Sequence, residues 1–172
     1  MEFVKTTQQE QKALANVLKE LFLLEGKAYS TKEVKEFIAN ETKSGRNFFL
    51  LKEGRDAVGC VNIHVDNGIA DLKHFFVVKD NIDRGYGTKL LENVIDYCRK
   101  HNANRIFSVI PRMHELLFVQ NGFSLDKNKV CVELINSMPE QQSNLQNQLK
   151  DISLVEEIGN RTAEKLRGLK TK

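Results

Sequence analysis

The sequence predicts an α+β fold in which one mixed, mostly antiparallel sheet is flanked by helices. From Asn47 to Val78, strand-like apolar runs are interrupted by turn residues at 54–56 and 66–68, a pattern typical of an antiparallel three-strand meander. Residues 70–110 then form the order strand, loop, helix, strand, in which two strands lie parallel across the helix. Antiparallel and parallel pairs in one chain indicate a mixed sheet.

Composition supports a globular protein without membrane spans. The chain has 172 residues, of which 41% are hydrophobic and 28% charged, enough for one core without metal or disulfide staples. Three well-separated cysteines favour reduced thiols, and no signal-peptide pattern opens the chain, so we expect a cytoplasmic location and no membrane contact. A net charge of +3 does not by itself indicate nucleic acid.

Helical and strand patterns alternate in the first half of the chain. A short strand is expected over 2–6, and leucines from Leu14 to Leu24 recur at helical spacing. Ser30 and Glu33 have the spacing of a capping box, which predicts a second helix ending at Gly45. The meander follows, with Asn67-Gly68 as a strong hairpin signal.

The second half contains the parallel pair and then a tail. An apolar face from Leu90 to Cys98 predicts a helix, 105–110 a strand, 113–120 a short helix and 123–135 a last strand or hairpin. Pro139 and a run rich in Gln and Asn then break the pattern. We therefore expect a domain over 1–136 and a linker with a helical tail over 137–172.

The segment Arg84-Gly85-Tyr86-Gly87-Thr88 stands where a strand gives way to a helix. Glycines let the backbone turn tightly and approach a ligand, and the first helical turn presents unpaired N–H groups that bind anions such as phosphate. Arg84 and Lys89 would add charge-assisted contacts. The alternative is a helix that is simply entered through glycines.

Together with the later segment Phe118-Val119-Gln120-Asn121-Gly122-Phe123, this loop resembles the GNAT superfamily of N-acetyltransferases over about residues 1–136. The resemblance implies a GNAT-like fold and acetyl-coenzyme A (acetyl-CoA) as cosubstrate. It also implies which residues bind the cofactor: the backbone of Arg84, Gly85, Tyr86, Gly87 and Thr88 at the pyrophosphate, and the main chain of Phe76, Val77 and Val78 at the pantetheine arm.

Two positions depart from the family pattern. Ile82 stands where the family usually has Gln or Arg, so one polar cofactor contact is missing. Phe118 stands where many members have a tyrosine that protonates the leaving thiolate. A thiol has a pKa near 8.5, so its thiolate leaves tolerably well without a strong acid.

Acetyl transfer requires a neutral amine, and therefore a proton acceptor. The candidate bases are Asp71, at a position where family members often carry glutamate, and His74. The alternatives are an exposed Asp71 that pairs with Lys73, and a His74 that is buried in the core on one face with Leu72 and Phe76. By the same resemblance, Ser108 and His114 lie near the cofactor strands.

Metal and base-stacking sites are not expected. Cys98 and His101 are three residues apart on a helix, but no second pair completes a metal site. The Phe48-Phe49 and Phe75-Phe76 pairs are assigned to the core rather than to nucleic-acid stacking.

The tail from Val155 to Leu166 resembles the helix-hairpin-helix motif of DNA-binding proteins. Glu157 stands where the first hairpin glycine should be and would repel phosphate, and acidic and basic residues nearly balance. The expectation is a weak nucleic-acid or protein contact through residues 151–172.

The predicted function is direct transfer of acetyl from acetyl-CoA to a small-molecule or peptide amine. The alternatives are an acyl-CoA sensor without turnover, and an acetyltransferase that its tail recruits to nucleic acid. The sequence selects neither the acceptor amine nor the oligomeric state.

Overall fold

The computed structural model describes residues 1–78, 84–111, 114–126 and 131–135. The predicted tail and Ile82 lie outside the described residues. No helix in this part of the chain is long and apolar enough to span a membrane.

A seven-stranded mixed sheet forms the centre of the described fold, in the order β1-β2-β3-β4-β5-β7-β6. Only β4 and β5 pair in parallel, and the other described pairs are antiparallel, which confirms the predicted sheet. The strands are β1 (Glu2–Lys5), β2 (Asn47–Glu53), β3 (Asp56–Asp66), β4 (Ile69–Val77), β5 (Arg105–Val109), β6 (Ser124–Leu125) and β7 (Cys131–Ile135).

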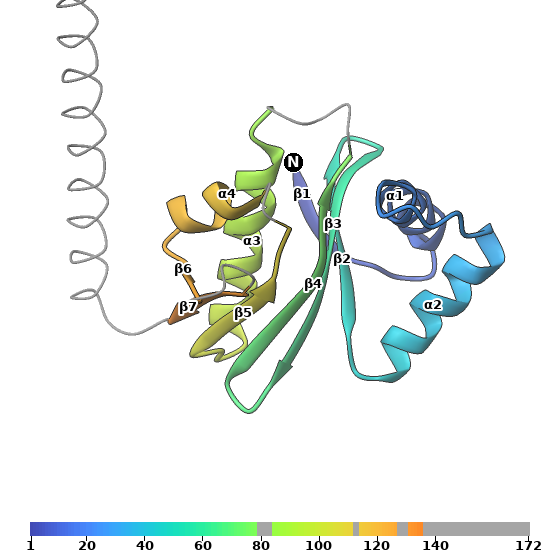
Figure 1. Ribbon diagram of the computed structural model, residues 1–172. Coiled ribbons are helices and arrows are strands. Elements are labelled where there is room, and N and C mark those ends of the chain that lie inside the picture. Colours follow the sequence, from blue (N-terminus) through green and yellow to red (C-terminus); the bar gives the residue numbers. More distant parts are fainter. Residues whose placement is uncertain (79–83, 112–113, 127–130, 136–172) are drawn as a thin grey trace, which may run out of the picture. The chain divides into compact units, whose positions relative to one another are not determined.

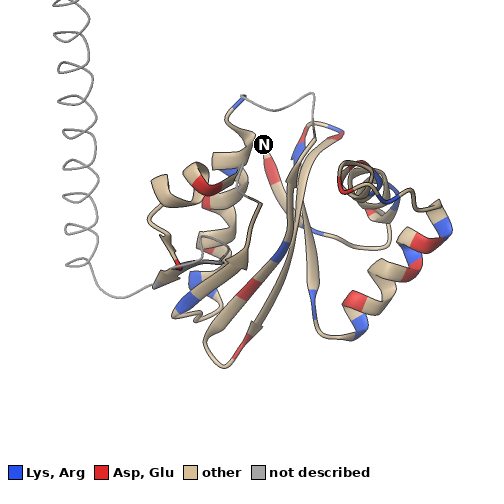
Figure 2. Cartoon of the chain, in the orientation of Figure 1, with Lys and Arg blue, Asp and Glu red and all other residues tan. Residues whose placement is uncertain are grey.

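Two helices cover each face of the sheet: α1 and α2 lie on one face, α3 and α4 on the other (Figure 1). They are α1 (Gln11–Leu24), α2 (Thr31–Lys43), α3 (Tyr86–Lys100) and α4 (Glu115–Gln120). The predicted capping box forms at α2, where Ser30 and Glu33 exchange both hydrogen bonds. Lys and Glu side chains are interspersed along α2, so this helix carries charges of both signs (Figure 2).

The sheet separates two apolar cores. The core under α3 and α4 includes Leu72, Phe75 and Phe118, and the core under α1 and α2 includes Phe48 and Phe76. Because both phenylalanine pairs are buried, their assignment to the core is confirmed.

A β-bulge interrupts β4 near its end. Cys60 pairs with Phe76, but Asn62 pairs with Lys73, so β4 holds one more residue than β3 over this stretch. His74 lies in the bulge with φ +51°, a left-handed conformation that is uncommon for a residue other than glycine. The bulge shifts the alternation of side chains between the two faces of the sheet.

The expectation that His74 shares a face with both Leu72 and Phe76 is therefore wrong. Leu72 packs in the core under α3, whereas the His74 ring contacts Phe22 and Phe37, which belong to α1 and α2. The extra residue turns His74 to the face of Phe76.

Candidate active site

A cavity lies where β4 and β5 part. Their parallel pairing runs from Ile69 with Arg105 to Leu72 with Ser108, and Ser108 Oγ donates to the Leu72 carbonyl at 3.1 Å. From there β4 continues to Val77 without pairing with β5. The cavity has a volume of about 550 Å³ and is lined by Leu21, Leu24, Glu25, His74, Phe75, Phe76, Val77, Gly87, Val109, Ile110, Pro111, His114 and Leu117.

The predicted anion site falls at the start of α3. Gly85 caps the helix with φ +76°, and the Lys89 N–H donates a hydrogen bond to the Gly85 carbonyl at 3.0 Å. The preceding N–H groups, from Tyr86 to Thr88, have no partner within the helix and carry the positive end of its dipole.

The two glycines leave the space that a phosphate chain needs. A Cβ on Gly85 would meet no atom within 4 Å, so the space before this residue is open. Gly87 lines the cavity, and a Cβ there would stand 3.2 Å from Leu117 Cδ2. The loop therefore has open space at Gly85 and borders the cavity at Gly87.

Side chains of the loop have different surroundings. Tyr86 is buried, and its hydroxyl donates to Glu53 at 2.5 Å, which raises the pKa of Tyr86 and ties the start of α3 to β2. Arg84 and Lys89 are exposed, and Lys89 Nζ lies 3.1 Å from Glu92. Both cations lie at the surface beside the start of α3.

Phe76 and Val77 line the cavity, as the predicted cofactor strand requires. The Val78 N–H bonds the Val58 carbonyl at 3.0 Å, on the β3 side. The opposite edge of β4, beyond Leu72, is not paired with β5 and is the edge on which main-chain contact with a pantetheine arm is expected.

His74 lies in the wall of the cavity. Its ring is half-buried and surrounded by the rings of Phe22, Phe37 and Phe48, with centroid distances of 6.1, 5.1 and 6.4 Å. Burial lowers the pKa of His74 below its ordinary value, while the negative charges of Glu41 and Glu25 act in the opposite direction. The imidazole is therefore neutral at neutral pH and able to accept a proton.

Asp71 has a different environment. Its carboxylate forms an ion pair with Arg46, which also donates to Asn62 Oδ1 at 3.2 Å and lies 3.6 Å from Glu41. Arg46 is only 12% exposed, and Asp71 is not among the residues that line the cavity. The structure thus pairs Asp71 with Arg46 rather than with Lys73.

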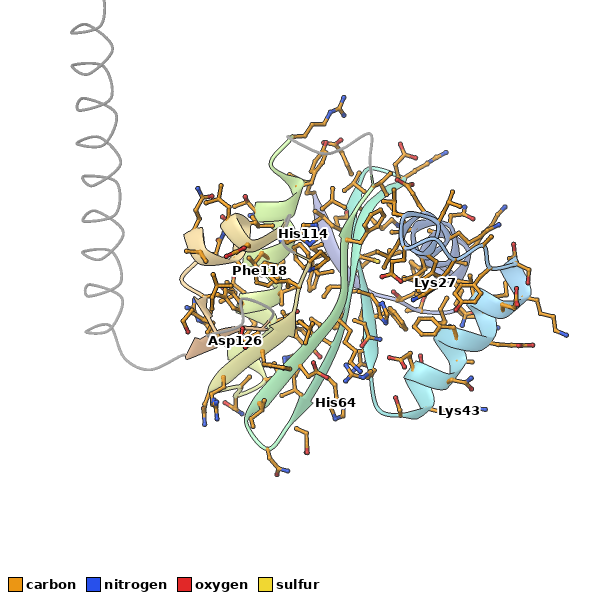
Figure 3. All side chains as sticks on the ribbon, viewed as in Figure 1. Lys27, Lys43, His64, His114, Phe118 and Asp126 are labelled. Carbon is orange, nitrogen blue, oxygen red and sulfur yellow. The ribbon has the colours of Figure 1, made fainter. Side chains whose placement is uncertain are left out.

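Phe118 is completely buried and packs between Phe75 and Phe123 at centroid distances of 5.1 and 4.9 Å. Figure 3 shows Phe118 with His114 between α4 and the sheet. His114 lines the cavity, four residues before Phe118. The family resemblance led us to expect His114 near the cofactor strands, and its place in the cavity wall depends on where α4 packs.

Glu25, in contrast, was missed by sequence reasoning. It follows the last residue of α1 and contributes a carboxylate to the cavity, where Lys27 Nζ lies 2.9 Å from it. Its place depends on how α1 packs over the bulged end of β4. Among the described residues, no group of three or more His, Cys, Asp or Glu side chains is placed to hold a metal ion.

Comparison with known proteins gives the cavity its context. No curated protein matches this chain significantly. The sequence profile of the acetyltransferase (GNAT) family matches residues 12–116, which is more than half of the chain.

Solved structures share the fold at low sequence identity. A GNAT-family acetyltransferase from Staphylococcus aureus Mu50 is 18% identical, with 79% of this chain and 99% of that chain covered and a TM-score of 0.62. The PaiA N-acetyltransferase of Thermoplasma acidophilum, in complex with coenzyme A, is 17% identical, with 78% and 98% covered and a TM-score of 0.63. A ribosomal-protein-alanine N-acetyltransferase from Brucella melitensis is 13% identical, with 78% and 99% covered and a TM-score of 0.62.

The family match, the mixed sheet and the glycine loop at the start of α3 agree with one another. The chain belongs to the acetyltransferase (GNAT) family, and its activity is the transfer of acetyl from acetyl-CoA to an amine.

Proposed function

We propose that acetyl transfer takes place in the β4–β5 cavity and that His74 is the general base. The observation that carries this proposal is the bulge, which turns a half-buried histidine from β4 into the wall of the cavity. Residues held in sparsely populated backbone conformations cluster at functional sites, where the surrounding structure supports the strain.

The cofactor enters from the start of α3. The backbone from Arg84 to Thr88 binds the pyrophosphate, Arg84 and Lys89 add positive charge, and the pantetheine arm follows the free β4 edge along Phe76, Val77 and Val78. Gly87 supports this path, because it belongs to both the first turn of α3 and the cavity lining. The thioester then lies near the bulge.

Transfer is direct, without an acetylated enzyme. Burial raises the pKa of Cys60 and of Cys98 to about 12, so neither is a thiolate at neutral pH. Both thiols are buried, and neither lines the cavity. A cysteine must be deprotonated to act as the nucleophile.

The reaction needs only proton and group transfer. The neutral amine nitrogen attacks the thioester carbonyl carbon, the C–N bond forms, and the C–S bond breaks with its electron pair on sulfur. His74 accepts a proton from the amine nitrogen, and the sulfur takes up one proton in return. Asp71 is the weaker candidate, because its carboxylate is already paired with Arg46.

The acceptor is a small-molecule or peptide amine. Apart from Glu25 and the two histidines, the side chains that line the cavity are apolar, which favours an amine next to an aliphatic or aromatic group. Leu24 and Val109 are 62% and 58% exposed, and they offer apolar contact where the acceptor enters.

The test is thiol release from acetyl-CoA with aliphatic amines, polyamines and peptides, measured across pH for wild type and His74→Asn. Asparagine tolerates the left-handed conformation but is not a base. We expect wild-type turnover with at least one amine and a fall of kcat on the order of 100-fold in the variant at neutral pH. Unchanged kcat in the variant would exclude His74 as the base.

The tail and the cellular location remain predictions. We propose that residues 151–172, which resemble a helix-hairpin-helix motif, make a weak nucleic-acid or protein contact, and that the protein is cytoplasmic. Salt-sensitive retention of the full chain on DNA, lost when residues 139–172 are removed while acetyl-CoA binding persists, would support recruitment to nucleic acid. No retention of the full chain would end that reading.

A further inference from the structure

The cavity has histidines on two opposite walls. The titratable side chains that line it, among the described residues, are Glu25, His74 and His114. The His74 ring contacts aromatic residues of the α1–α2 face, whereas the His114 ring meets Phe75, which belongs to the core under α3, at 5.9 Å. The two imidazoles thus approach the reaction from different sides of the sheet.

His114 carries an unused polar atom. Its Nδ1 is buried and has no hydrogen-bond partner within the described part of the chain, although its backbone N–H bonds the Pro111 carbonyl at 2.9 Å. A buried polar atom without a partner is costly. Because Nδ1 is buried, Nε2 is the ring nitrogen of His114 that remains to meet a ligand in the cavity.

His114 comes from the face of the sheet that carries α3, where the proposed cofactor loop lies. His114 precedes α4, which lies on the α3 face of the sheet. Leu117 follows one helical turn later, and its Cδ2 lies 3.2 Å from the position that a Cβ on Gly87 would take. Phe118, at the position where the family resemblance implies a tyrosine, is completely buried and has no hydroxyl. Among the described residues that line the cavity, His114 is therefore the polar side chain that comes from the α3–α4 face.

We propose that the His114 imidazole donates an N–H hydrogen bond to the thioester sulfur and stabilises the thiolate as the C–S bond breaks. This step rests on the proposed function, because it requires acetyl-CoA in the cavity. The electron pair of the C–S bond goes to sulfur, and the proton that completes the thiol derives from the amine nitrogen by way of His74 and water. His114 begins and ends the cycle neutral.

Burial lowers the pKa of His114, so it is neutral at neutral pH and one ring nitrogen carries a hydrogen that can be donated. Hydrogen bonds to a charged acceptor are about twice as strong as those between neutral groups, so the bond strengthens as charge develops on sulfur. Stabilisation that appears only as charge develops accelerates the reaction.

The test is the pKa of the coenzyme A thiol when bound, followed by the ultraviolet absorbance of its thiolate as pH is raised. We compare wild type, His114→Phe, His114→Asn and the control His64→Gln. Asparagine retains an N–H donor, whereas phenylalanine retains only a ring. His64 lies near the C-terminal end of β3, away from His114 (Figure 3). Acetyl-CoA affinity and kcat are measured on the same proteins.

We expect the bound thiol pKa to rise by about one unit in His114→Phe, with kcat lowered about 10- to 100-fold, partial recovery in His114→Asn and wild-type values in His64→Gln. Equal thiol pKa values in wild type and His114→Phe, with coenzyme A bound to both, would overturn the role of His114 alone. Failure of wild type to bind coenzyme A would overturn the proposed function as well.

Discussion

The side chain of His74 reaches the cavity through one backbone dihedral. At a φ of +51°, Gly is tolerated best, Asn, Asp and His are the commonest other residues, and β-branched residues are strained. A histidine is therefore compatible with the backbone of the bulge, and its half-buried ring lies in the cavity wall.

The pH dependence of kcat tests this role. Because burial lowers the pKa of His74 below 6.5, the neutral form persists to lower pH than in a free histidine. We expect wild-type activity to fall on the acid side only below pH 6.5, and that limb to disappear from the residual activity of His74→Asn. An identical acid limb in both proteins would show that another group controls it.

Asp71→Asn separates the two candidate bases. Loss of the ion pair with the nearly buried Arg46 should lower the free energy of unfolding by roughly 1–3 kcal/mol, measured by denaturant titration. The pH profile of kcat should stay unchanged, because Asp71 does not line the cavity. A loss of activity greater at neutral than at high pH would instead restore Asp71 as the base.

At the level of elements, turn and capping signals predicted most of the fold. The Ser30–Glu33 box and the Asn67-Gly68 turn act over a few residues, so the sequence alone reveals them. The bulge in β4 was missed because it arises from packing against β3 and α1 and carries no glycine or proline. The placement of β7 between β5 and β6 also depends on contacts distant in sequence.

The same distinction holds for the site. The glycine loop was predictable, because its chemistry lies in consecutive residues at a helix start. The opposition of His74 and His114 was not, because forty residues of chain separate them and only the parting of β4 and β5 brings both to one cavity.

Gly85→Ala tests the start of α3, with Gly26→Ala as a matched control. Both glycines have φ near +77° and no atom within 4 Å of an added Cβ, so each alanine should cost about 1–2 kcal/mol of stability. Only Gly85→Ala should weaken acetyl-CoA binding, by about 10-fold or more in a calorimetric titration, since it disturbs the anion site. Equal affinities in the two variants would contradict the loop assignment.

At the scale of the whole molecule, the proposed mechanism uses both faces of the sheet. The α3–α4 face holds the glycine loop and His114, while the α1–α2 face holds the aromatic cluster around His74. A mixed sheet whose parallel pair separates before its ends gives both faces access to one cavity.

The two buried histidines also link stability to pH. Both have pKa values lowered by burial, so below pH 6.5 the unfolded chain takes up protons that the folded chain resists. The free energy of unfolding should therefore be greatest above pH 6.5 and fall as pH falls below it. In denaturant titrations, the double variant His74→Asn/His114→Asn should show a shallower fall, and an unchanged slope would contradict the burial of neutral imidazoles.

The chain has four histidines, and this offers the most direct test of the active site. His74 and His114 line the cavity, whereas His64 bonds the Gly45 carbonyl and His101 stacks on Tyr97. We would follow the four imidazole signals by nuclear magnetic resonance while acetyl-CoA is added. The signals of His74 and His114 should shift together with saturation, while those of His64 and His101 stay in place. Saturable binding that leaves His74 and His114 unmoved would show that the thioester does not enter this cavity.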